Sequence, residues 1–306
     1  MLKLQTTHPT HGFCLTDQYT NAIKNLAPTG IWKAVLVNSG LHHQVTARFC
    51  KLHHRGSRLI GSAPFVNANL FTHKWQNLAA FWQQDQAYID IKDSHGQLAY
   101  CLKSLHDPNS VEAEHLSEWF DTYAGLSAIT PKTTHIKRFK THRFAVQPID
   151  QGQLQQIWLS FKHPQQANSL FKAQAHQLPT LFESLGNRFA RSMTFEQLVH
   201  HLERLRLSQA FMSITARNEA LTQTHLGRIR KLFQTDDKLL LTDAGFKLQI
   251  LSKHISQAWC LKIPTDTASA IQIKLLDSRN QEVLTITDQQ PCHSSHQWQQ
   301  IFQQLN

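Results

Sequence analysis

Three side chains that could bind a metal ion stand within five residues near the C-terminus: Cys292, His293 and His296. Thiolate and imidazole are ligands that zinc and similar metals accept. The run Cys292-His293-Ser-Ser-His296 is a weak signal on its own, because a polar tail that happens to contain cysteine and histidine has the same pattern. Two interpretations of this segment therefore stay open, a metal site and a tail without a site.

Histidine is abundant along the whole chain, with 20 among 306 residues. Such a content indicates either contact with a metal or metal-containing group, or a solvated histidine-rich surface. Six histidines form the adjacent pairs His42-His43, His53-His54 and His200-His201. Neighbouring side chains on a strand point to opposite faces, so we do not expect such a pair to chelate one ion.

The formal net charge is +10. It favours a partner with carboxylate or phosphate groups, or a soluble basic surface. The five cysteines are odd in number, and no Cys-x-x-Cys pair is present, which argues against a zinc ribbon and a disulfide framework. Reduced thiols and a cytoplasmic location are the prediction. No apolar run approaches the roughly 18 residues of a membrane-spanning helix, and the N-terminal residues have no apolar stretch typical of a secretory signal.

The chain encodes one unit twice. Residues 34–38 align with 214–218 at an offset of 180 residues, which places Asn38 opposite Asn218. After a slip of four residues, Asp93-Ser94 meets Asp277-Ser278. A repeat of this length is a domain-sized duplication and not a solenoid. Ligand sites often lie between two such halves.

Each copy is predicted to begin with a helix and to continue as strands. The helices are expected over 16–26 and 194–207, the second capped by Thr194. Strands about ten residues apart favour an antiparallel meander. They are expected over 33–38, 211–215, 238–242, 246–250, 255–263, 271–276 and 282–287. A last short helix over 298–305 is expected to dock its apolar side on the sheet.

The segment between the copies, roughly 107–192, has no counterpart of the sheet. Helices are predicted over 112–123, 154–161 and 167–185, the last interrupted by Pro179, with a loop over 130–140. The sequence therefore predicts an α+β fold with an internal duplication, in which two antiparallel β-sheet halves are stacked centrally with flanking helical pairs. The expected parts are an N-terminal repeat (1–110), connecting helices and loop (111–160), and a C-terminal repeat with a helical lead-in (161–306).

Several spaced motifs of the second copy agree in order with one known family. They are Leu241-Thr-Asp-Ala-Gly-Phe-Lys-Leu248, His254-Ile-Ser-Gln-Ala-Trp259 and Lys262-Ile-Pro-Thr265. This series resembles the C-terminal half of the bacterial HemS/ChuS/PhuS haem-utilisation family. The first copy resembles the N-terminal half of that family more weakly, through Val37-Asn38, Leu70-Phe71 and Trp75. The family is itself an internal duplication, so the resemblance covers most of the chain.

The resemblance implies a cytoplasmic protein that binds haem between the C-terminal sheet and the helices leading into it. In the family, a histidine a few residues after a tryptophan ligates the iron, so His163 after Trp158 is the candidate metal ligand, with His176 or no ligand as the alternatives. Phe71, Lys262 and Arg228 are candidates for further contacts with the cofactor. Neutral imidazole suits iron, and haem needs an apolar slot with cations at its mouth.

Some family positions are not retained. An arginine of the first copy is replaced by Asn69, and at the C-terminal side the family's glutamine, tyrosine and arginine fall on Thr285, Thr287 and Gln290. Each arginine–propionate contact is a charge-assisted hydrogen bond. These departures therefore predict weaker haem binding, or an anchor elsewhere. The candidates for that anchor are Arg228, Lys231 and Lys247.

The predicted function is haem binding and trafficking in haem uptake and iron acquisition, with a haem importer or a haem-degrading enzyme as possible partners. Whether the chain is itself an enzyme that degrades haem stays open. The alternative is a binding module that kept the duplicated fold and now binds another anionic ligand. No nucleic-acid motif is present, so nucleic acid is not an expected partner.

Overall fold

The structure is a computed structural model that describes residues 11–48, 51–56, 58–127, 150–175, 177–266, 268–288 and 295–305. It has an α+β fold with two nine-stranded antiparallel sheets, which confirms the predicted fold class and the duplication. Contacts divide the chain into two compact units. Unit 1 takes the described residues of 1–37, 44–137 and 218–223, and unit 2 takes those of 38–43, 138–217 and 224–306. The boundaries 1–110, 111–160 and 161–306 remain predictions.

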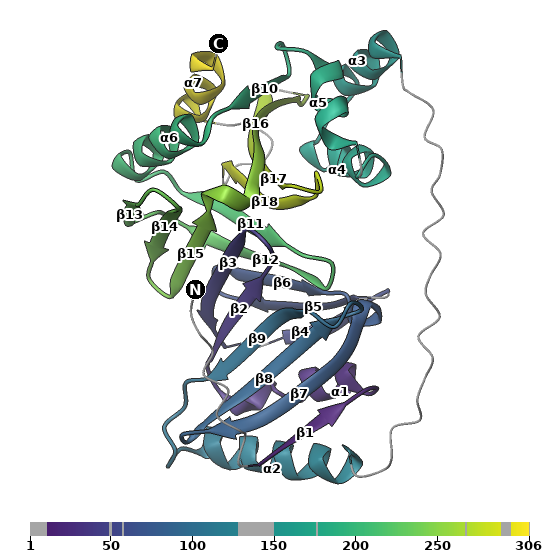
Figure 1. The fold of residues 1–306 in the computed structure, drawn as a ribbon, viewed down its shortest axis with the longest axis vertical. Helices are drawn as coiled ribbons and strands as arrows, with labels where there is room; N and C mark the ends of the chain where they lie inside the picture. The colour runs from purple at the N-terminus through teal and green to yellow at the C-terminus, as the bar shows by residue number, and fades with distance from the viewer. Residues whose placement is uncertain are drawn as a thin grey trace. The chain divides into compact units, whose positions relative to one another are not determined.

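Unit 1 contains a five-stranded antiparallel meander in the order β1-β7-β8-β9-β2 and a three-stranded one in the order β4-β5-β6. The strands are β1 (His11–Leu15), β2 (Trp32–Val37), β4 (Lys51–Arg55), β5 (Arg58–Ala63), β6 (Val66–Leu70), β7 (Trp75–Gln83), β8 (Gln86–Asp93) and β9 (Leu98–Ser104). The helices are α1 (Tyr19–Lys24), α2 (Val111–Ser127) and the short 3-10 turns at Ala27–Thr29 and Thr72–Lys74. Helix α2 lies beside β1, where Trp119 and Phe120 contact Phe13 (Figure 1).

Unit 2 repeats this arrangement, with a five-stranded meander β10-β16-β17-β18-β11 and a three-stranded one β13-β14-β15. The strands are β10 (Ala190–Met193), β11 (Met212–Arg217), β13 (Lys231–Gln234), β14 (Lys238–Asp243), β15 (Phe246–Leu251), β16 (Ile255–Pro264), β17 (Ser269–Asp277) and β18 (Glu282–Asp288), with a 3-10 turn at Ser252–His254. The helices are α3 (Gln151–Leu159), α4 (Pro164–Ala173), α5 (Leu178–Leu185), α6 (Phe195–Leu207) and α7 (His296–Gln304). Strands β3 (Leu41–Ala47) and β12 (Leu221–Gly227) are divided between the two units.

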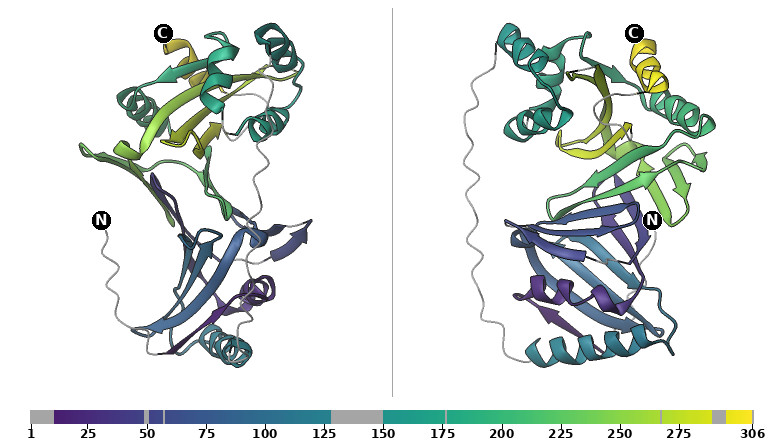
Figure 2. Two further views of the ribbon diagram at one scale, coloured as in Figure 1. Left: turned by 45° about the vertical axis from the view of Figure 1, so that its right-hand side comes forward. Right: turned by 180° about the vertical axis from the view of Figure 1, so that it is seen from behind.

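Helices cover both faces of the five-stranded meander in unit 2. Helices α3, α4 and α5 lie on one side of β16, and α6 and α7 on the other, as two directions of view show (Figures 1 and 2). Because side chains alternate along a strand, neighbours such as Leu261 and Lys262 belong to opposite faces. Leu261 pairs with Gln272, and Lys274 pairs with Thr285, so these four side chains lie on one side of the sheet. We call that side the α4 face. The opposite side, with Cys260 and Lys262, is the α7 face.

The two copies share the turns that the sequence aligned. The side-chain oxygen of Asn38 accepts the backbone N–H of Gly40 and Leu41 at 3.0 and 2.9 Å, and Asn218 does the same for Ala220 and Leu221 at 2.9 and 3.0 Å. A short polar side chain that satisfies the backbone of its own turn stabilises that turn. The identical pattern in both copies is structural support for the duplication.

A second shared turn follows β8 and β17. Asp93 accepts the N–H of His95 and Gln97 at 2.8 and 3.0 Å, and Asp277 accepts those of Arg279 and Gln281 at 2.9 and 3.0 Å. The strand irregularities also recur, because the register shifts after Trp75 in unit 1 and after Ile255 in unit 2. Bulges of this kind bend a strand locally. The copies therefore share their irregular features as well as their regular strands.

Most predicted helices are confirmed. Thr194 caps α6 through a hydrogen bond from the N–H of Gln197 at 3.2 Å, and α7 buries Trp298, Ile301 and Phe302. The expected long helix over 167–185 is wrong in one respect: two helices are present, and Pro179 lies in the first turn of the second. Proline suits that position because its missing N–H has no partner there anyway. The predicted loop over 130–140 lies outside the described residues.

Among the described residues, no helix is both long enough and apolar enough to cross a membrane.

Candidate functional site

His163 is the residue before α4, and its backbone is fixed by its own helix. The side-chain oxygen of Gln166 accepts the backbone N–H of Lys162 at 2.6 Å and of His163 at 3.0 Å. Pro164 follows as the first helical residue, where its fixed φ suits the helix. The imidazole of His163 is exposed, so its ring is available to a ligand. The sequence at 163–166 thus places an accessible imidazole at the start of α4.

Trp158 connects this region to the sheet. It is fully buried, and its indole N–H donates to the backbone carbonyl of Lys262 at 3.0 Å. Its ring lies 5.4 Å from that of Phe161 and 6.0 Å from that of Phe171. An aromatic side chain with a satisfied N–H is a strong anchor, because it combines apolar burial with a hydrogen bond. Trp158 therefore holds α3 and α4 against β16.

An apolar cluster lies between the sheet and helices α3 to α5. It consists of Leu154, Trp158, Phe161, Ala167, Phe171, Leu178, Leu181, Phe182, Leu185, Phe189, Ala190, Trp259, Leu261, Ile263, Ala270 and Leu276. Phe182 of α5 and Trp259 of β16 are 5.5 Å apart at their ring centres. This cluster fills the part of the α4 face nearest to β16.

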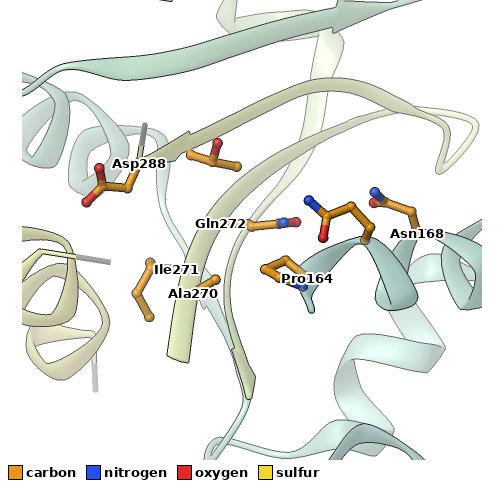
Figure 3. A pocket seen from close by; sticks show the side chains of 8 residues that line it. Pro164, Asn168, Ala270, Ile271, Gln272 and Asp288 are labelled. Carbon is orange, nitrogen blue, oxygen red and sulfur yellow. The ribbon is translucent and has the colours of Figure 1, made fainter. Parts of the chain in front are cut away.

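A small cavity opens beside the apolar cluster, between α4 and strands β17 and β18 (Figure 3). Its volume is about 60 Å³, and its lining residues are Pro164, Gln165, Asn168, Ala270, Ile271, Gln272, Thr287 and Asp288. Gln272 points toward Pro164 and Asn168, and Ile271 and Asp288 point the other way (Figure 3). Gln272 is only 7% exposed, and its side-chain oxygen has no hydrogen-bond partner among the described residues. A buried unpaired amide oxygen is costly, so this cavity contains unmet hydrogen-bonding capacity.

A charged group lies two residues further along β17. Lys274 is 1% exposed, and its ammonium donates to Glu282 at 2.7 Å and to the hydroxyl of Thr285 at 2.9 Å. The hydroxyl of Thr285 donates in turn to the second oxygen of Glu282 at 2.8 Å. On the helix side, the ring of Phe171 covers the ammonium at 4.7 Å. The lysine is therefore paired within the sheet and shielded by α4.

Electrostatics keep this pair ionised. Burial alone would raise the pKa of Glu282, but the charges of Lys274 and Arg217 outweigh burial and hold that pKa at about 2. Burial lowers the pKa of Lys274, and Glu282 opposes that shift. We take the pair as charged, because the ammonium has two hydrogen-bond acceptors and an aromatic face.

The four site residues taken from the sequence lie in different places. Lys262 is half-buried on the α7 face, where its ammonium lies 6.0 Å from the ring centre of Phe302, so it points away from α4. Arg228 is exposed after β12 and donates to the side chain of Gln209 at 3.3 Å. Phe71 belongs to unit 1, with the guanidinium of Arg58 at 5.6 Å from its ring centre. The backbone of Lys262, by contrast, contacts the α3 side through its carbonyl, which accepts the indole N–H of Trp158.

The remaining positions from the sequence divide into two groups. Thr287 lines the cavity, and Asn69 donates to the hydroxyl of Thr222 at 3.3 Å within unit 1. His176, Gln290, Cys292 and His293 lie outside the described residues. Within the described part of the chain, no group of three or more His, Cys, Asp or Glu side chains is arranged to hold a metal ion. His296, the first residue of α7, is exposed there.

In two of the three adjacent histidine pairs, one imidazole is more buried than its neighbour, whereas His53 and His54 are both exposed. On β3, His43 is fully buried and His42 is half-buried, and on α6, His201 is buried and His200 is exposed. His43 lies 5.2 Å from the ring of Phe246, and His225 stacks on that ring at 4.0 Å. Burial lowers the pKa of His43 to about 3 and also lowers the pKa of His225. These two imidazoles are therefore neutral core residues.

The sequence reasoning did not identify Gln272, Lys274 or Glu282. A signal was present, because Gln272 and Lys274 alternate with Ile271 and Ile273 and so share one face of a strand. Alternation predicts that the two side chains share a face of the strand, but it does not predict which helix packs over that face. The burial of Lys274 depends on Phe171, about a hundred residues away in sequence, and no local pattern indicates that contact.

Comparison with known proteins supports the motif analysis. Residues 177–305 match the family model of the haemin-degrading HemS.ChuX domain. No curated protein is significantly similar to the chain in sequence. Holo-PhuS, a heme-binding protein from Pseudomonas aeruginosa, has a similar structure, with a TM-score of 0.83 and 16% identity over 97% of this chain and 87% of that chain. The heme degrading enzyme ChuS of Escherichia coli O157:H7 is also similar, with a TM-score of 0.80 and 17% identity over 98% of this chain and 88% of that chain.

These findings confirm the resemblance that the motifs indicated. The segment 177–305 matches the HemS.ChuX domain model, and a fold similar to that of PhuS and ChuS extends over nearly the whole chain. At 16 to 17% identity, structural similarity establishes the fold. Function has to be argued from the site.

Proposed function

We propose that the chain binds haem and passes it on, as a cytoplasmic trafficking protein of haem uptake and iron acquisition. The observation that carries this proposal is the match of residues 177–305 to the haemin-degrading HemS.ChuX domain. The similarity of nearly the entire fold to that of holo-PhuS, a heme-binding protein, supports it. A haem importer that delivers the cofactor and a haem-degrading enzyme that receives it are the partners that such a role requires.

We propose His163 as the iron ligand, because it is the exposed imidazole at the start of α4, next to the cavity that Pro164 lines. Neutral imidazole is a common axial ligand of haem iron. Phe71, Lys262 and Arg228 remain proposed contacts, although Lys262 points to the α7 face. When bound, haem would supply the redox-active iron, and the chain would supply the ligand and the slot.

This cavity does not fit haem. Its volume is about 60 Å³, and pockets for ligands of drug size measure roughly 300–1,000 Å³. Its lining is rich in amides (Gln165, Asn168 and Gln272) and contains no lysine or arginine among the described residues. Binding between α4 and the sheet therefore requires α4 to move away from β17. The contacts that resist this movement include the buried Pro164, Ala167 and Phe171.

The test is a hemin titration followed by visible spectroscopy. The chain is expected to give a Soret band with a stoichiometric end point, and His163→Ala is expected to lose or shift that band, because it removes the ligand without touching the core. His254→Ala is the matched control, since His254 is also exposed in unit 2. An unchanged spectrum in His163→Ala would refute the ligand assignment, and no saturable binding to the unaltered chain would refute the function. In that case the alternative is a duplicated fold that binds another anionic ligand.

Haem degradation is the second candidate, because the family model and the description of ChuS both name it. The haem complex would be incubated with ascorbate in the presence of catalase, which removes peroxide that bleaches haem without an enzyme. Since Thr285 and Thr287 replace the glutamine and tyrosine that the resemblance implies, fewer side chains are positioned to steer oxygen. We therefore expect the Soret band to persist. Its enzyme-dependent loss, with a new product band, would establish degradation.

A further inference from the structure

A row of side chains crosses the five-stranded meander of unit 1, on the face that turns away from α2 (Figure 1). Trp82 of β7 contacts Phe120 of α2, with 5.0 Å between the ring centres. Because neighbours on a strand point to opposite faces, Phe81 points away from that helix. The strand pairings place one residue from each of β1, β7, β8, β9 and β2 directly beside the next: Gly12, Phe81, Tyr88, Lys103 and Lys33. We call these residues the cross-strand row.

Aromatic rings form one half of the cross-strand row. The rings of Phe81 and Tyr88 are stacked, with 6° between their planes and 5.5 Å between their centres. On the far side of Tyr88, the ammonium of Lys103 lies 5.3 Å from the ring centre. On the far side of Phe81, Gly12 is exposed and has no side chain, and a Cβ at position 12 would come within 2.9 Å of the Cβ of Phe81. The row therefore leaves space above Gly12 for a flat ring that stacks on Phe81.

Positive charge forms the other half of the row. Lys103 and Lys33 are directly opposite each other on β9 and β2, an arrangement in which like charges repel. Among the described residues, neither lysine forms an ion pair with a carboxylate. On β8, Lys92 is exposed on the same face, and the acid beside it on that face is Asp90, whose pKa is raised by burial. This part of the surface is therefore positively charged and suits an anion with more than one charge.

The duplicated fold does not require such a row. The corresponding residues of unit 2, paired across β10, β16, β17, β18 and β11, are Ala190, Leu261, Gln272, Thr287 and Ser213. None of these five side chains is aromatic or charged, and Gln272 is buried beneath α4. In unit 1, by contrast, Gly12 is exposed and the other four residues of the row are half-buried. The aromatic and cationic side chains are therefore a property of unit 1 alone.

We propose that the cross-strand row binds single-stranded nucleic acid, with a base stacked on Phe81 above Gly12 and backbone phosphates at Lys103 and Lys33. Aromatic side chains on a sheet, next to cations, suit a single strand because every base has a π-face and every nucleotide carries a phosphate. The formal net charge of +10 also favours a polyanion.

The length of the row distinguishes a strand from a single nucleotide. Neighbouring strands of a sheet are about 4.8 Å apart, which places Lys103 roughly 14 Å and Lys33 roughly 19 Å from Gly12 along the row. A ligand that reaches both ends must therefore carry several phosphates. The five strands lie far apart in the sequence, so a search for local nucleic-acid motifs does not detect this arrangement. The proposal is independent of haem binding, because all of these residues belong to unit 1.

The experiment titrates the full chain into a fluorescein-labelled oligothymidylate and follows fluorescence anisotropy at several salt concentrations. The test variants are Phe81→Leu and Lys33→Gln/Lys103→Gln. The matched controls make the same changes at exposed positions of unit 2, and they are Phe233→Leu and Lys238→Gln/Lys253→Gln. Thermal unfolding followed by circular dichroism checks that each protein is folded. A second probe is the duplex of the same oligonucleotide with its complement.

Phe81→Leu is expected to weaken binding of the oligothymidylate by about tenfold, because it removes the stacking of one base. For Lys33→Gln/Lys103→Gln, the slope of log affinity against log salt concentration is expected to become less steep by about 1.4, since each phosphate contact with a single strand contributes about 0.7. Both controls should match the unaltered chain. The duplex should bind more weakly than the single strand, because its paired bases are not free to stack on Phe81.

Four outcomes would overturn the proposal. The first is the absence of saturable binding to the oligothymidylate. The second is an equal loss in the two double-lysine variants, which would mean that overall charge and not the row holds the strand. The third is equal affinity for duplex and single strand. The fourth concerns hemin, which is also planar and anionic: displacement of the oligonucleotide by hemin, together with weaker hemin binding in Phe81→Leu, would make the row a haem contact.

Discussion

Acidification from about pH 7 to about pH 4 is expected to lower the free energy of unfolding by about 3 kcal/mol through His43 alone, because each pH unit between two pKa values is worth about 1.4 kcal/mol. Burial holds the pKa of His43 at about 3, well below its ordinary value of 6.5. Between pH 6.5 and about pH 3, the imidazole of His43 is therefore protonated in the unfolded chain and neutral in the folded chain. Stability is complete above pH 6.5 and falls as the pH falls toward 3.

Other buried imidazoles act in the same direction. Burial lowers the pKa of His201 to about 4 and also lowers that of His225. Glu282 adds to the loss only below its ordinary pKa of 4.5, because its folded value is about 2. The histidines therefore dominate the window between about pH 6.5 and about pH 4.5.

Urea unfolding across this pH range measures the effect. His43→Gln should flatten the dependence of the unfolding free energy on pH, whereas His254→Gln should leave it unchanged, since His254 is exposed. An equal pH dependence in His43→Gln and the unaltered chain would show that His43 is not the titrating group. Because the comparison uses slopes, a loss of stability caused by repacking around Phe246 does not affect it.

Replacing Lys274 alone by methionine is expected to lower the free energy of unfolding by about 3–5 kcal/mol, because breaking a buried ion pair leaves the other charge without its partner. Glu282 would then be left with Thr285 and the more distant charge of Arg217. The double variant Lys274→Met/Glu282→Leu is expected to stay within about 1 kcal/mol of the unaltered chain, because apolar side chains of similar volume can replace such a pair at little cost.

The measurement is a double-mutant cycle by chemical denaturation, with Glu282→Leu as the second single variant. A large coupling energy between positions 274 and 282 is the expected outcome. Additive effects of the two single variants would mean that the 2.7 Å contact contributes little to stability. The cycle needs no ligand, so its result is independent of haem binding.

The fold was predictable from the sequence where local signals agree with tertiary structure. Thr194, the spacing of Leu198, Leu202 and Leu205, and the paired turns at Asn38 and Asn218 indicated elements that the structure contains. Pro179 was misjudged, because proline both ends helices and begins them, and only the backbone decides between the two.

The site was less predictable, because the burial of its residues depends on helices that pack on the sheet from distant parts of the chain. Lys262 was chosen from its place in a motif, but the alternation of β16 directs it to the α7 face. Lys274 looks like a solvent-facing residue in the sequence and becomes buried only when α4 places Phe171 over it. Packing of a helix on a sheet brings together segments that are far apart in the chain. Local patterns in a single sequence do not predict such contacts.

The shared bulges and turn caps carry historical information. A register shift after Trp75 and after Ile255 is no requirement of a β-sheet, so its presence in both copies dates it to the single ancestral unit. Against that inherited frame, one cross-strand position has changed sign: Asp90 opposite Cys101 in unit 1 corresponds to Lys274 opposite Thr285 in unit 2. The charge difference therefore arose after the gene doubled. The two copies thus have the bends of their sheets in common and differ in the charge that one of the shared positions carries.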